Sequence, residues 1–81
     1  MIEALGLGER LDEQAIRSHW DGISGPMIAR HTEELHLRKG RLTIRVDSAP
    51  LRQELGYMRT AMIELINKRM GREVVTELVI R

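Results

Sequence analysis

The chain has 81 residues, a formal net charge of +1 and 42% hydrophobic residues, which predicts one small domain with a modest core. It contains no cysteine, so disulfides and thiolate metal sites are excluded. No apolar run approaches the ~18 residues of a spanning helix, and the start lacks the pattern of a signal peptide, so we expect a cytoplasmic protein without a membrane segment.

The N-terminal third predicts an arm followed by two helices. Residues 1–8 include two closely spaced glycines and are expected to form a flexible or loosely packed arm, with residues 9–81 as the single domain. A first helix is predicted from Asp12, a suitable cap, towards Trp20, which we expect to anchor the core. Residues 22–26 then break this helix, and Pro26 opens a short second helix that ends at His31.

The middle of the chain predicts a β-hairpin. Leu35 and Leu37 alternate with polar residues in a first strand, and residues 41–47 alternate strictly in a second strand. Lys39-Gly40 supplies the turn between them.

Residues 48–71 predict one long amphipathic helix. Ser48 can cap it, and Gly71 is a natural left-handed stop. Its apolar residues at helical spacing form one stripe, which we expect to lie on the sheet: Leu51, Leu55, Met58, Met62, Leu65 and Ile66. Residues 74–80 predict a last strand that is apolar on both parities, and therefore covered on both faces or packed against a partner.

These elements give an α+β fold with the order α-(α)-β-β-α-β. Because one helix returns the chain to the starting end of the sheet, the third strand should run parallel to the second. We therefore expect a small three-stranded mixed sheet with the helices on one face.

Cations gather on the predicted hairpin. Residues 36–45 contain no acid, and the basic side chains of this region, with one more on the neighbouring strand, are Arg38, Lys39, Arg41, Arg45 and Arg81. Such a cluster on one sheet face can follow a phosphate backbone. The alternative is a solvated face whose charges keep an exposed sheet soluble. The chain has only one Trp, one Tyr and no Phe, which argues against a base-stacking platform.

A second, weaker candidate is the G-x-x-G sequence formed by Gly22, Ser24 and Gly25. Glycines allow close backbone approach, and N–H groups at a helix start attract phosphate. The alternative is a simple corner between two helices. The spacing around Ser24 does not match a nucleophile elbow.

No pattern in the sequence indicates catalysis, a cofactor or a metal. The spacing of His19, His31 and His36 fits no common ligand motif. Glu33 and Glu34 are adjacent on a predicted strand, so we expect them to point to opposite faces. We therefore expect a protein that is not an enzyme.

An ordered set of residues resembles the DciA-like family over roughly residues 9–81. The set comprises apolar and small residues with a few polar ones: Trp20, Gly25, Ile28, Ala29, His31, Thr32, Gly40, Leu42, Ile44, Val46, Ser48, Ala49, Glu54, Leu55, Ile66, Asn67 and Gly71. The resemblance implies a KH-like two-layer α+β sandwich. It does not transfer a KH phosphate loop to Gly22 and Gly25, because these precede the hairpin. Some members are named for a zinc ribbon, which a chain without cysteine cannot form.

The same resemblance implies a role at replication initiation, where better understood members help to load or operate the replicative helicase and have affinity for DNA. We therefore expect a non-enzymatic module that binds nucleic acid, single-stranded DNA or RNA, as a replication accessory. The alternative is a protein–protein adaptor or self-associating scaffold, in which the long helix or the last strand docks on a helicase or on a second copy in a homodimer.

Overall fold

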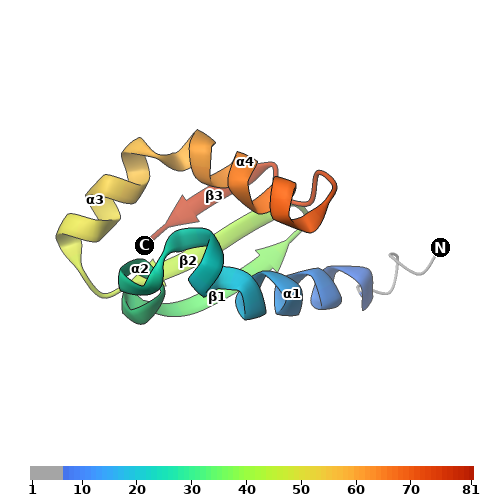
Figure 1. Ribbon diagram of the computed structural model, residues 1–81, viewed down its shortest axis with the longest axis horizontal. Helices are drawn as coiled ribbons and strands as arrows, with labels where there is room; N and C mark the ends of the chain where they lie inside the picture. Colours follow the sequence, from blue (N-terminus) through green and yellow to red (C-terminus); the bar gives the residue numbers. More distant parts are fainter. Residues whose placement is uncertain (1–6) are drawn as a thin grey trace.

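The computed structural model describes residues 7–81 and confirms the α+β fold with a three-stranded mixed sheet. The elements, in chain order, are α1 (Leu7–Ser24), α2 (Pro26–His31), β1 (Thr32–Arg38), β2 (Arg41–Val46), α3 (Ala49–Tyr57), α4 (Arg59–Met70) and β3 (Glu77–Ile80). Figure 1 shows the α1–α2 pair and the α3–α4 pair packed along the sheet, with the two pairs on either side of its middle. None of the helices in residues 7–81 is long and apolar enough to cross a membrane.

The first helix is longer than predicted. It begins at Leu7 rather than near Asp12 and continues through Gly22 to Ser24. Of the expected N-terminal arm, residues 1–6 lie outside the described residues, whereas Leu7 and Gly8 form the start of α1. Trp20 is only 4% exposed and anchors the core, as predicted.

The hairpin is confirmed. β1 and β2 pair antiparallel, and the turn is made by Lys39 and Gly40, both with positive φ, of 51° and 78°. This is the conformation of a two-residue turn whose twist matches the strands. The buried face of β2 consists of Leu42, Ile44 and Val46, and β3 pairs with β2 in parallel, as the single crossover requires.

The predicted long helix is in fact two helices that meet at Met58. A straight helix from Ala49 to Met70 would be about 33 Å long, whereas β2 spans only about 20 Å. The bend at Met58, two residues after Gly56, lets both halves follow the sheet (Figure 1). It also divides the predicted stripe: the buried residues are Leu55, Met62 and Ile66, while Met58 and Leu65 are 39% and 47% exposed.

The last strand is shorter than predicted. β3 begins at Glu77, and the buried Val74 and Val75 belong to the loop before it. Asn67 of α4 holds this loop: its side-chain oxygen accepts from the amides of Val74 and Val75, both at 2.8 Å. Its side-chain nitrogen donates to the carbonyl of Val75 at 2.9 Å. The loop therefore buries two valines while Asn67 satisfies both of their amides and the carbonyl of Val75.

Candidate nucleic-acid interface

The face of the sheet opposite the helices carries the predicted basic residues. In β1 and β2, side chains alternate between the buried and the exposed face, so every second residue points to the open side. The register places Arg38 opposite Arg41, His36 opposite Thr43 and Glu34 opposite Arg45. On the other side of β2, Glu77 lies opposite Arg41 and Val79 opposite Thr43. We call this surface the open face.

The structure brings onto the open face carboxylates whose pairing with the arginines the sequence pattern did not predict. Nε of Arg41 lies 3.2 Å from Glu77, and Arg45 lies 3.4 Å from Glu33 and 3.8 Å from Glu34. These pairs are about half exposed, so each contributes little stability. They do lower the positive potential around Arg41 and Arg45.

The prediction that Glu33 and Glu34 point to opposite faces is wrong. The register of β1 against β2 shifts between Thr32 and Glu34, and this irregularity interrupts the strict alternation. As a result both carboxylates are exposed and both reach Arg45. The strand period puts Glu34 on the same face as His36, two residues later, so the sequence does predict Glu34 on the open face. The bulge that brings Glu33 to Arg45 as well has no evident sequence signal.

Three of the predicted cations have no carboxylate partner among the residues that the structure describes. Within residues 7–81, the charged groups of Arg38, Lys39 and Arg81 make no ion pair, in contrast to Arg41 and Arg45. Two hollows lie on this surface. One, of about 380 Å³, is lined by Arg38, Lys39, Arg41 and Glu77 at the hairpin end. The other, of about 230 Å³, is lined by Glu34, His36, Thr43, Arg45 and Arg81.

The G-x-x-G segment forms the corner between α1 and α2. The hydroxyl of Ser24 donates to the carbonyl of Trp20 at 2.8 Å, and Gly25 has a φ of 93° that suits glycine. A side chain at Gly22 would meet the guanidinium of Arg69, its nearest atom only 3.1 Å from the added carbon. These contacts explain why glycines and a serine occur at this corner. A phosphate contact there stays a prediction.

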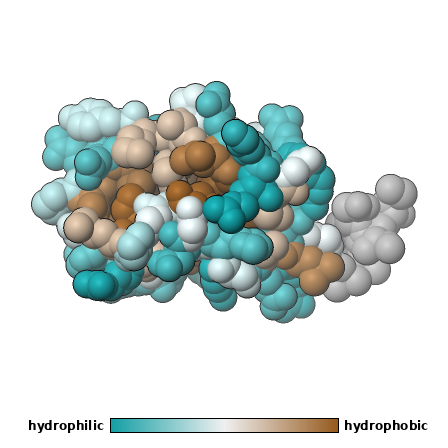
Figure 2. Space-filling view, viewed as in Figure 1, coloured by the Kyte–Doolittle hydropathy of each residue, from teal (hydrophilic) through white to brown (hydrophobic). Residues whose placement is uncertain are grey.

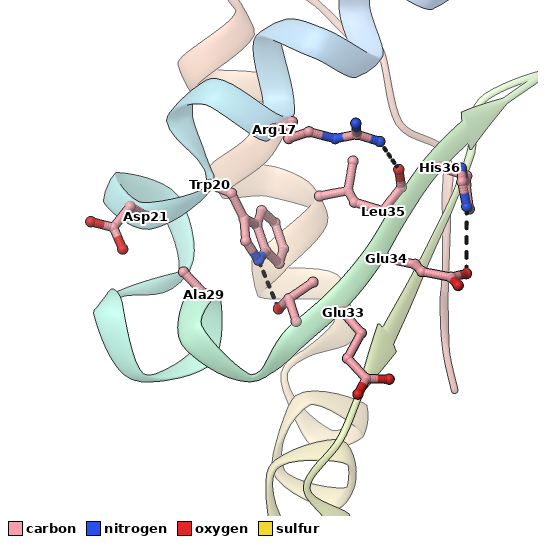
Figure 3. Close-up of a pocket in the computed structure, with 9 residues that line it drawn as sticks. Arg17, Trp20, Asp21, Ala29, Glu33, Glu34, Leu35 and His36 are labelled. Carbon is pink, nitrogen blue, oxygen red and sulfur yellow. Dashed lines mark hydrogen bonds and ion pairs between the residues drawn. The ribbon is translucent and has the colours of Figure 1, made fainter.

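A larger cavity, of about 550 Å³, opens between α1, α2 and the start of β1 (Figure 3). Trp20, Ala29 and Leu35 give it an apolar part, and its acids are Asp21, Glu33 and Glu34. The indole N–H donates to the hydroxyl of Thr32 at 3.0 Å, and Arg17 donates to the carbonyl of Leu35 at 2.7 Å. Because Arg17 is already bonded to the backbone and the rim of the cavity is acidic, this cavity is a poor site for phosphate.

The histidines are dispersed over the surface. His31 contacts Asp47 at 2.7 Å, and His36 lies 3.6 Å from Glu34. In the part of the chain that the structure describes, no group of three or more His, Asp or Glu side chains could hold a metal ion.

Comparison with known proteins identifies the family. The family model described as "Dna[CI] antecedent, DciA" matches residues 1–80. A UPF0232 protein of Corynebacterium glutamicum is 28% identical over 77 residues, which cover 95% of this chain and 43% of that protein. A UPF0232 protein of Bifidobacterium longum is 30% identical over 63 residues, covering 78% and 40% respectively. The chain thus spans less than half the length of these relatives, and it belongs to the DciA family.

Proposed function

We propose that this chain is a non-enzymatic, cytoplasmic nucleic-acid-binding domain that assists the replicative helicase. Membership of the DciA family supports the link to DNA replication. The observation that carries nucleic-acid binding is the open face, where Arg38, Lys39 and Arg81 have no ion-pair partner within residues 7–81. Cations without carboxylate partners are free to replace the counterions of a phosphate backbone.

The geometry favours binding to phosphates without reading the bases. Trp20 is buried, and the other aromatic residue, Tyr57, lies at the α3–α4 corner rather than on the open face. The strand side chains on the open face are short or charged apart from the imidazole of His36, which lies 3.6 Å from Glu34, so they offer little stacking surface for bases. We expect single-stranded DNA or RNA of mixed sequence to bind with similar affinity and with strong salt dependence.

The test is fluorescence anisotropy with labelled single-stranded oligomers at several salt concentrations. We expect the slope of log affinity against log salt to indicate about three phosphate contacts. The double variant Arg38→Glu/Lys39→Glu should weaken binding strongly and lower that slope. A matched control, Arg10→Glu/Arg59→Glu, makes the same change of charge on exposed helix residues and should bind nearly as the parent does. Equal losses in both variants would show that only net charge matters.

A second candidate function is docking on a protein, such as the helicase, through the helices. Apolar side chains gather in the middle of the face that Figure 2 shows, between the α1–α2 and α3–α4 pairs. Large apolar residues also remain exposed on these helices, among them Met27, Tyr57, Met58 and Leu65. If the open-face variants left DNA binding unchanged but Met58→Asp/Leu65→Asp abolished binding to the helicase, docking would be the main activity.

A further inference from the structure

The two edges of the sheet differ in the contacts that they make with the rest of the described chain. Because β2 is central, β1 and β3 each have one edge without a strand neighbour in residues 7–81. An exposed edge is a row of unpaired N–H and C=O groups that can accept another strand, and most proteins protect it.

The outer edge of β1 is closed by side chains of α1. Arg17 donates to the carbonyl of Leu35 at 2.7 Å, Glu13 accepts from the amide of Leu37 at 2.9 Å, and Glu9 accepts from the amide of Lys39. The spacing is matched: four residues of helix rise about 6 Å, and two residues of strand about 6.6 Å. Thus each step of four residues along α1 contacts one backbone group of the next outward-facing residue of this edge.

No element of the described chain covers the outer edge of β3 in this way. The amide of Arg81 donates to Ile44 at 2.9 Å and its carbonyl accepts from Val46 at 2.8 Å, while the amide of Glu77 donates to Gly40 at 3.2 Å. Because backbone groups alternate in direction along a parallel strand, the amides and carbonyls of Leu78 and Ile80 point outward. No hydrogen bond from elsewhere in residues 7–81 reaches them.

We propose that this edge is a homodimer interface, in which β3 pairs antiparallel with β3 of a second copy around a two-fold axis at Val79. Leu78 of each copy would then exchange both backbone hydrogen bonds with Ile80 of the other. This pairing gives hydrogen-bond partners to the outward-pointing amides and carbonyls of both strands and leaves their bonds to β2 unchanged.

The charges on the strand agree with this register. Centring the pair on Val79 places Glu77 opposite Arg81 of the second copy, and the symmetry repeats this ion pair. Glu77, Val79 and Arg81 share the open face, because the intervening Leu78 is buried on the helical side. Val79, which is partly exposed, meets its own copy at the axis. Registers shifted along the strand lose the pairing of opposite charges.

The dimer would change the surface on which the proposed function rests. Edge pairing around an axis normal to the sheet puts the open faces of both copies on the same side of one six-stranded sheet, where Glu77 of one copy pairs with Arg81 of the other and leaves Arg38 and Lys39 of each copy for phosphate. Dimerisation of this kind does not require nucleic-acid binding, since it depends only on the backbone and the charges of β3.

Swapping the charges of Glu77 and Arg81 tests the pairing directly. In sedimentation equilibrium over a wide range of concentration, we expect the parent to be in monomer–dimer exchange. Glu77→Arg or Arg81→Glu alone, which juxtapose like charges twice per dimer, should each raise the dissociation constant about tenfold. The double variant Glu77→Arg/Arg81→Glu should restore dimerisation. The control Glu73→Arg changes the charge in the preceding loop and should dimerise as the parent does.

Circular dichroism identifies any variant that fails to fold, and amide hydrogen exchange gives a readout that needs no substitution. In the parent, exchange at Leu78 and Ile80 should slow as the protein concentration rises. A protein that stays monomeric at all concentrations would overturn the proposal. So would a dimer that is indifferent to the charge changes, or one that the double variant does not restore, because another surface or another register would then be responsible.

Discussion

The hydrogen bonds of Asn67 give the sharpest test of how this fold is held together. The change is Asn67→Ala, which removes the side chain that accepts from the amides of Val74 and Val75 and donates to the carbonyl of Val75. A net contribution of about 1 kcal/mol for each hydrogen bond gives a loss of about 3 kcal/mol. Val75 is fully buried, so water cannot readily replace these bonds.

Urea denaturation followed by the fluorescence of Trp20 measures this loss, because Trp20 is the single tryptophan and is buried. In thermal unfolding, a loss of 3 kcal/mol corresponds to a decrease of ~12–24 °C in the melting temperature for a domain of this size.

The matched control is Asn67→Asp, which keeps the two acceptor bonds but puts a carboxylate oxygen where the donor to Val75 was, against the carbonyl of Val75. We expect it to cost less than alanine, since a charged acceptor strengthens the bonds to both amides and offsets part of the repulsion at the Val75 carbonyl. If Asn67→Ala costs less than about 1 kcal/mol, these hydrogen bonds do not hold the loop.

Two further substitutions probe other contacts that the tertiary structure makes. Thr32→Val removes the hydroxyl that accepts from Trp20 and donates to Ile28, and should cost about 1–3 kcal/mol of unfolding free energy. Thr32→Ser, which keeps the hydroxyl, should cost clearly less; equal losses would assign the effect to packing instead. Gly40→Ala puts a side chain at a φ of 78° and 2.8 Å from the hydroxyl oxygen of Thr76, and should cost about 1–3 kcal/mol. An unchanged melting temperature would show that the turn relaxes freely.

The candidate site was only partly readable from the sequence. The alternation of residues 41–47 and the Lys39-Gly40 turn predict the hairpin, and the hairpin places Arg38, Arg41 and Arg45 on one face. What the sequence could not show is which of these cations are paired. The partner of Arg41 is Glu77, which lies on another strand and meets it only through the register of β2 with β3.

The sequence by itself determined the elements whose signals are local. The strand period, the Ser48 cap, the left-handed Gly71 and the single crossover that makes β3 parallel all depend on neighbouring residues or on connectivity. The tertiary structure decided the rest. The bend at Met58 arises because a straight helix would outrun the sheet, and the start of β3 at Glu77 depends on Asn67 holding the preceding loop. The closed edge of β1 requires α1 to lie beside it, a contact between residues far apart in the sequence that no local pattern specifies.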